Sequence, residues 1–247
     1  MSKLLNPENG LFTGINKTID TLWVGLLWSV ISLGAFVGGI FTQNDIIALV
    51  GMIISIVLVG PASCALYYAT VKVTRRSRSY ITKEFFRSFK DNFKIGAITS
   101  TVFGVFGYLM YVDIQYANVL IDEDNSFGNV MFVVFLAGTV FAVLALCWIF
   151  PLLSRFTVNF FGLLRNAMII STRHLVRSIL LLLLWGVSGV LIYVFYQYIL
   201  YMIILAPLIP GLLALIRSFI IEPVMKKYIT EPEGDPEETG IDEWYRE

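Results

Sequence analysis

Residues 46–94 decide the fold, because they set an apolar stretch, IIALVGMIISIVLVGPASCALYYATV, directly against a basic one, KVTRRSRSYITKEFFRSFKDNFK. The apolar stretch has no charged residue and is longer than the roughly 20 residues that cross a bilayer as a helix. The basic stretch holds eight lysines and arginines against only Glu84 and Asp91. Basic residues are enriched in short loops on the cytoplasmic side of a membrane. The boundary therefore predicts a membrane-spanning helix that ends in the cytoplasm.

The rest of the chain has the composition of a membrane protein. Of its 247 residues, 57% are hydrophobic and 15% are charged, and the mean hydropathy is +0.76. A soluble domain of this size has no interior large enough for so much apolar surface. Six stretches are long and apolar enough to span a membrane: residues 19–41, 46–71, 95–118, 130–151, 179–199 and 201–221. We therefore expect an all-α, polytopic integral membrane helical bundle of about six transmembrane helices within residues 1–228.

The charged residues between these stretches alternate in sign along the chain. Residues 119–129 contain acids but no base, whereas residues 152–178 contain four arginines and no acid. Together with the basic stretch, this pattern allows all 18 lysines and arginines to be placed on one side of the membrane. The positive-inside rule then predicts that both termini are cytoplasmic. Residues 229–247, which hold eight acids, predict a disordered cytoplasmic tail.

The last two predicted spans lie in one apolar run, residues 179–221, which is interrupted only by Arg217. As a single helix this run would be about 64 Å long, twice the thickness of the hydrocarbon, so the chain must fold back. The tyrosines around residues 196–201 favour an external turn there. The alternative is a turn at Pro207, Pro210 and Gly211, which would make the last span short or re-entrant.

Few residues are suited to catalysis. His174 is the one histidine, and it lies among basic residues near the predicted inner interface. Cys64 and Cys147 fall in apolar stretches without metal-ligand spacing, which is typical of buried thiols. The sequence has no phosphate-binding glycine loop, no zinc-protease helix motif and no serine elbow. We therefore expect no enzyme activity, no cofactor and no metal site.

Two kinds of irregularity interrupt the predicted spans. Asp113 and Gln115 lie in the outer third of the third span, either as an intramembrane polar site or at the outer interface. Prolines remove a helical hydrogen bond and kink a helix unless neighbours satisfy the freed carbonyl. The predicted kinks are at Gly60, Pro61, Pro207 and Pro210. Such kinks either line a functional site or only shape the packing of helices.

Each basic cytoplasmic stretch also carries apolar residues at helical spacing. In the first, the apolar face is formed by Ile81, Phe85, Phe86, Phe89 and Phe93. Arg87 belongs to its charged side, and Thr82 is a candidate N-cap. The second stretch repeats the pattern over residues 156–168. These patterns predict two short amphipathic helices that lie in the interface or against a partner. Because a proline-containing span precedes each helix, at Pro61 and Pro151, we expect a weak internal repeat.

Several of these segments resemble one known family. The segments are VGPA at 59–62, ALY at 65–67, FFRSFK at 85–90, FPLLSRF at 150–156 and LLRNA at 163–167. Over roughly residues 10–225 the chain resembles the YesL-like bacterial membrane proteins, with the Gly-Pro-Ala element as the most specific part. The resemblance implies a multi-pass protein of the bacterial plasma membrane without an assigned catalytic activity. Members tend to be encoded beside ABC-type carbohydrate importers, which implies an accessory role in oligosaccharide uptake.

We therefore expect a non-catalytic membrane subunit that binds the permease of an ABC-type carbohydrate importer and stabilises or tunes it. The expected partner-binding residues are Phe85, Phe86, Arg87 and Phe89 of the first basic stretch and Trp244 and Tyr245 of the tail. Membrane lipids are the other expected partners, and nucleic acid is not one. Two alternatives stay open. One is an independent small-solute transporter or channel with Asp113 and Gln115 along its path, and the other is a membrane sensor or scaffold for carbohydrate utilisation.

Overall fold

The computed structural model is all-α, and it describes residues 10–75, 80–123, 125–196 and 208–228, among which there is no strand. The helices are α1 (Gly10–Phe41), α2 (Asp45–Arg75), α3 (Ile81–Asp91), α4 (Phe93–Asp122), α5 (Ser126–Leu153), α6 (Phe160–Arg173), α7 (Leu175–Tyr196) and α9 (Ile209–Met225). Asn125 begins α5 and Asn159 begins α6 by accepting a hydrogen bond from a backbone N–H of the first turn. The predicted cap at Thr82 is wrong, because α3 begins after Tyr80 and has no side-chain cap.

Four of the described helices, α1, α2, α4 and α5, are long and apolar enough to cross a membrane. A fifth span is formed if α6 and α7 are counted as one element, although the two helices meet at an angle of 102°. Much of their apolar surface faces outward, because no more than 28% of any of the four spanning windows is buried. Long apolar helices with exposed apolar sides are typical of membrane spans. The chain is therefore a multi-pass membrane protein.

The last predicted span differs from the helix that is found. The predicted span covers residues 201–221, whereas α9 runs from Ile209 to Met225 and has 17 residues, with Pro210 in its first turn. At about 1.5 Å per residue it is roughly 26 Å long, slightly less than the hydrocarbon thickness. Because proline has no N–H to donate, a helix begins readily there. Pro210 and Gly211, which belong to the alternative turn, lie within the first turns of α9 instead. Pro207 and the residues of the tyrosine turn after Tyr196 lie outside the described residues.

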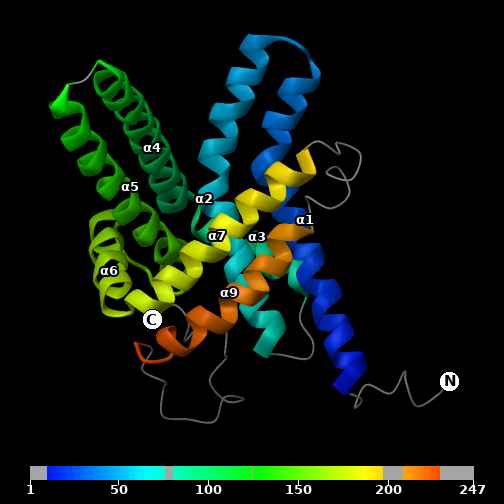
Figure 1. Cartoon of the computed structure of the whole chain (residues 1–247). Coiled ribbons are helices and arrows are strands. Elements are labelled where there is room, and N and C mark those ends of the chain that lie inside the picture. The colour runs from blue at the N-terminus through cyan, green and yellow to red at the C-terminus, as the bar shows by residue number, and fades with distance from the viewer. Residues whose placement is uncertain (1–9, 76–79, 124, 197–207, 229–247) are drawn as a thin grey trace.

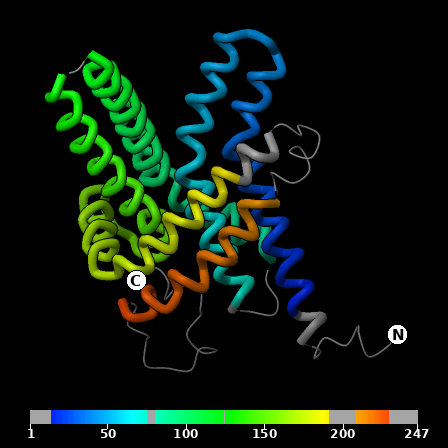
Figure 2. The backbone as a smooth tube through the Cα atoms, viewed as in Figure 1, coloured from blue at the N-terminus to red at the C-terminus, as the bar shows by residue number. Residues whose placement is uncertain are grey.

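Two antiparallel helix pairs, α1 with α2 and α4 with α5, stand side by side and diverge towards one end (Figure 1). At the opposite end, here named the base, all the helices meet, and α2 contacts α1, α3, α4, α5 and α9. Helices α7 and α9, yellow and orange in the tube drawing, run obliquely across the front of the two pairs (Figure 2). The core therefore lies in the base, and the far ends of the two pairs are arms with little covering.

The base is packed through small residues and large buried side chains. In the base, an added Cβ at Gly211 of α9 would collide with the Thr21 carbonyl of α1, and in the α1–α2 arm one at Gly51 would collide with the Ala35 carbonyl. Small residues at these crossings let helix backbones approach closely, which is how membrane helices associate in lipid. The largest fully buried side chains include Trp148, Phe85, Ile149, Leu163 and Leu181. They belong to two clusters that join α2 and α5 to the shorter helices.

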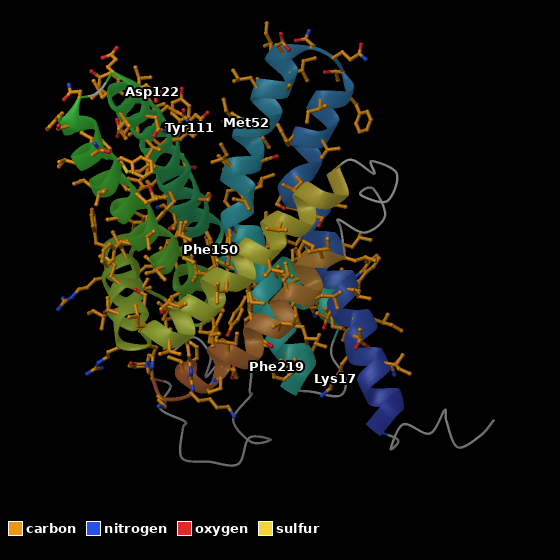
Figure 3. The ribbon with its side chains drawn as sticks, viewed as in Figure 1. Lys17, Met52, Tyr111, Asp122, Phe150 and Phe219 are labelled. Carbon is orange, nitrogen blue, oxygen red and sulfur yellow. The ribbon has the colours of Figure 1, made fainter. Side chains whose placement is uncertain are left out.

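Charges separate between the two ends of the molecule. Lys17 lies in the base near the N-terminal end of α1, and Asp122 lies at the tip of the α4–α5 arm (Figure 3). The other tip carries Asp45, the first residue of α2. Basic residues occur where α2, α3, α6 and α9 end in the base. The base is therefore the basic end of the molecule, and the tips of the arms are acidic.

Candidate functional site

The Gly60–Pro61 element lies where α2 crosses α4 most closely. An added Cβ at Gly60 would collide with the carbonyl of Gly96, and one at Gly96 would lie 2.9 Å from the Pro61 nitrogen. Pro61 has no N–H, so the Val57 carbonyl four residues earlier loses its helical hydrogen bond. Ser100 of α4 donates to that carbonyl at 3.2 Å. Pro61 therefore leaves the Val57 carbonyl free to accept a hydrogen bond from α4, and the Gly60–Pro61 element joins α2 to α4.

Below this crossing, Lys72 lies near the end of α2 and is 5% exposed. Its ammonium is 2.8 Å from the carboxylate of Glu84 on α3 and 5.0 Å from the centre of the Tyr68 ring. A buried ammonium requires a counter-charge, and an aromatic face adds further attraction. The ion pair therefore holds α3 against the end of α2.

A second buried ion pair joins the end of α5 to α9. Arg155, 4% exposed, forms an ion pair with Glu222, and its guanidinium lies 5.5 Å from the centre of the Tyr67 ring. The two oxygens of Glu222 are approached by the two terminal nitrogens of Arg155, the bidentate geometry that suits guanidinium and carboxylate. Sequence analysis missed this pair. The signal was available, because Glu222 is the only acid between Asp124 and Glu231.

A hydrogen-bonded group of polar side chains surrounds His174, between α6 and α7. The buried Trp148 indole of α5 donates to Ser178 Oγ at 2.8 Å, and Ser178 donates to the Ser171 carbonyl at 2.9 Å. His174 Nε2 lies 3.3 Å from the Tyr228 hydroxyl. Partial burial, and then the positive charges of neighbouring basic residues, lowers the pKa of His174. This group lies at the 102° bend between α6 and α7, and His174 is part of the packing at the base.

The predicted partner face on α3 divides into a buried and an exposed part. Phe85 is fully buried and packs in a cluster with Val24, so it belongs to the core and not to a docking surface. Phe89 is partly buried against the same cluster. Phe86 is 47% exposed, and Arg87 beside it is exposed. The apolar face of the 11-residue α3 is wider than its contact with the bundle, so part of that face stays exposed.

The predicted intramembrane polar pair is not brought together. Asp113 is partly buried and Gln115 is exposed. Two residues apart on a helix differ by about 200° in direction, so they lie on nearly opposite sides of α4. Asp113 lies near the side that carries Met110 and Ala117, which meet Gly138 and Gly128 of α5. The two residues therefore cannot line one path along α4.

Gln115 instead belongs to a polar stripe that also contains Tyr108 and Tyr111. These residues continue the side of α4 on which Gly104 meets Ile56 of α2, and an added Cβ at Gly107 would meet nothing within 4 Å. Tyr108 is 68% exposed and Tyr111 is 60% exposed. Tyr111 and Met52 of α2 lie on the facing sides of the two arms (Figure 3). Sequence analysis missed this stripe, although its three- and four-residue spacing is visible in the sequence.

The remaining predicted residues either lie outside the described ranges or are buried. Trp244, Tyr245 and Pro207 lie outside the described residues. Cys64 and Cys147 are buried free thiols, as expected. Among the described residues, no group of three histidine, cysteine or acidic side chains is placed to hold a metal ion. The site is therefore a base with paired charges, beside an exposed polar stripe on one arm.

Comparison with known proteins finds similarity in the first half of the chain. No curated protein and no solved structure matches the chain. Residues 21–114 match a family described as Protein of unknown function, DUF624. The match takes in the Gly60–Pro61 crossing, the Lys72–Glu84 pair and Tyr108 and Tyr111 of the polar stripe, whereas the Arg155–Glu222 pair and the group around His174 lie outside it.

Proposed function

We propose that this chain is a non-catalytic membrane subunit that binds the permease of an ABC-type carbohydrate importer through the arm built from α4. The observation that carries the proposal is the polar stripe of Tyr108, Tyr111 and Gln115. Tyr108 lies at the midpoint of the 30-residue α4, about 23 Å from either end. Tyrosines facing lipid normally lie at the membrane interfaces, since a hydroxyl in hydrocarbon has no partner. A protein neighbour with polar groups suits this stripe better than lipid does.

The charges of the base support a binding role over an ion-coupling role. Lys72 is held by Glu84 and Arg155 is held by Glu222, so these cations are neutralised within the chain. A carrier of protons or ions uses groups that change partner or charge during transport. Pairs of this kind instead stiffen the region from which both arms project.

The identity of the partner comes from the family resemblance. The proposal places the chain among the YesL-like proteins of the bacterial plasma membrane, in agreement with the DUF624 match. The basic base then faces the cytoplasm, with both termini on that side, and α9 is the sixth membrane helix, lying obliquely at this cytoplasmic end. Phe86 and Arg87 on α3 provide a second contact at the cytoplasmic surface.

The test is a pull-down of the tagged chain from its own host in mild detergent, with copurifying proteins identified by mass spectrometry. We expect a sugar-importer permease in fixed ratio to the wild type, and a loss of most of it with the double variant Tyr108→Leu and Tyr111→Leu. The matched control is Tyr116→Leu. This tyrosine is also exposed on α4, at 57%, but it points about 100° away from the stripe. Equal recovery from all three chains would refute the stripe as the contact surface.

The alternative with a specific observation behind it is an independent solute transporter, because Asp113 is a partly buried carboxylate within α4. It predicts solute flux into liposomes by the purified chain alone, abolished by Asp113→Asn. Recovery of the chain without any permease, together with such flux, would replace the subunit proposal by the transporter.

A further inference from the structure

Arg217 is a basic residue within the last helix, α9. The charge partition places it with the cytoplasmic residues at the end of the last span. In the structure it is instead the central residue of α9, about 12 Å along the axis from either end. Its neighbours on the outer side of the helix are apolar, with Ile216 46% exposed and Phe219 67% exposed. A guanidinium at this position requires a stabilising partner.

The described residues do not provide Arg217 with a hydrogen-bond acceptor. Its Nε is buried and has no hydrogen-bond partner among them. The guanidinium lies over the ring of Trp185 on α7, with Cζ 4.9 Å from the ring centre. Glu222, the only acid on α9, is paired with Arg155. Stacking on an indole stabilises the charge but uses none of the five N–H donors. Arg217 is thus a positioned cation whose donors point to no acceptor in the described chain.

The second half of the chain contains another guanidinium in a similar state. Arg177 Nη1 on α7 is buried and also lacks a partner among the described residues. Arg177 and Trp185 are eight residues apart, so they lie on the same side of α7 with the fully buried Leu181 between them. In contrast, the buried cations Lys72 and Arg155 each have a carboxylate. Among the described residues, the contact of Arg217 with Trp185 therefore places a guanidinium without a carboxylate between α7 and α9.

We infer that Arg217 and Trp185 form a binding site for a phosphate-type oxyanion. An oxyanion supplies several acceptors in the fork geometry of a guanidinium, and charge-assisted bonds of this kind are the strongest available to it. Basic pockets between membrane helices bind the phosphates of lipid headgroups in this way. Trp185 is 43% exposed, so the site opens at the surface of the bundle where a lipid can approach. A lipid headgroup and a free phosphate present the same group.

The test measures binding to the purified full chain in neutral detergent after removal of endogenous lipid. The probes are phosphatidylglycerol, diacylglycerol with the same acyl chains, and inorganic phosphate, and the readouts are retained ligand in native mass spectrometry and the shift in melting temperature. We expect phosphatidylglycerol to bind wild type and diacylglycerol to bind poorly. We expect Arg217→Gln to bind phosphatidylglycerol about tenfold more weakly, because it loses one charge-assisted hydrogen bond.

The matched control is Arg165→Gln, which removes the same charge from an exposed position on α6 and should leave binding unchanged. If Arg217→Gln does not fold, Arg217→Lys retains the charge but loses the planar fork, and it should still bind several-fold more weakly. Inorganic phosphate that stabilises wild type as strongly as the lipid, with the effect lost in Arg217→Gln, would assign the site to a free oxyanion. Undiminished phosphatidylglycerol binding by the Arg217 variants, or equal binding of diacylglycerol, would overturn the inference.

Discussion

Each half of this chain buries one cation near the end of a proline-containing helix, and the two halves neutralise that cation in different ways. In the first half, α2 carries Pro61 and ends in the buried cation Lys72, which pairs with Glu84 on the helix that follows. In the second half, α5 carries Pro151 and is followed by the buried cation Arg155, which pairs with Glu222 on the last helix. Each cation also faces a tyrosine ring. The parallel organisation expected from the two prolines therefore extends to a buried cation in each half.

The difference between the halves lies in the distance to the counter-charge. Lys72 and Glu84 are 12 residues apart, whereas Arg155 and Glu222 are 67 residues apart. The first half supplies its own carboxylate, and the second half depends on α9. The first half is also the part that matches DUF624. We therefore expect the first half, which contains its own counter-charge, to fold more independently than the second half, whose counter-charge comes from a distant helix.

The most destructive test of this comparison is Glu222→Gln. The side chains of Arg155 and Glu222 are 2% and 18% exposed, so the substitution removes the Glu222 carboxylate from a buried guanidinium. Breaking a buried pair costs about 3–5 kcal/mol. We expect a large fall in melting temperature in detergent and detachment of α9 from the base, detected as faster proteolysis after residue 208.

The control for that prediction removes both charges. Replacing Arg155 by Met and Glu222 by Leu leaves no unpaired charge, and such replacements are often nearly neutral. The double variant should therefore be more stable than Glu222→Gln alone. A double variant that is as unstable as the single one would show that shape, not charge, joins α9 to the base.

A smaller effect is expected from Glu84→Gln in the first half. Lys72 has a flexible stem that can carry its ammonium towards water, and the neutral amide retains a hydrogen-bond acceptor. The loss should be about 2 kcal/mol, the scale of one hydrogen bond to a charged group. Thermal unfolding of the two glutamine variants side by side measures the comparison directly. Equal destabilisation would contradict the view that only the second half depends on a remote helix.

Ser100→Ala tests the proline crossing that is specific to the first half. The substitution removes the donor to the Val57 carbonyl that Pro61 leaves free. We expect about 1 kcal/mol of destabilisation, with the fold retained. Thr101→Ala is the matched control, since Thr101 donates only within α4, to the Ala97 carbonyl. The Ser100→Ala effect should disappear in a Pro61→Ala background, because an alanine N–H at position 61 restores the helical hydrogen bond to the Val57 carbonyl.

The smallest predicted effect concerns pH and the second half. The pKa of His174 is lowered in the folded state, so the unfolded chain binds more protons near pH 6. Stability contributed by neutral His174 is therefore lost as the pH falls through the range below about 6.5. Melting temperatures between pH 8 and about pH 5 should fall less for His174→Gln than for wild type. An identical pH profile for the two chains would show that His174 does not contribute to the pH dependence of stability.

The sequence predicts some features of this molecule well because they depend on local patterns. The apolar stretches gave the four long helices and the amphipathic periodicity gave α3 and α6, since length, hydropathy and spacing are properties of neighbouring residues. Tertiary contacts changed the meaning of single residues. Phe85 was predicted to bind a partner, whereas it lies in the core. The apolar face of a helix does not show in the sequence whether another helix of the same chain covers it.

Long-range features were the hardest to predict. The isolated acid Glu222 marks one partner of the ion pair, but its pairing with Arg155 depends on how α9 packs in the base, which local sequence patterns do not show. The same holds for the contact between Arg217 and Trp185. The positive-inside rule predicts on which side of the membrane a basic residue lies, and it does not predict that a guanidinium stacks on an indole from another helix.

The long separation of Arg155 and Glu222 has a consequence for synthesis. A ribosome releases Arg155 67 residues before Glu222, at a rate of about 5–20 residues per second. For several seconds the growing chain therefore contains Arg155 without the Glu222 carboxylate that pairs with it in the finished protein. A chain that stops before α9 never gains this ion pair.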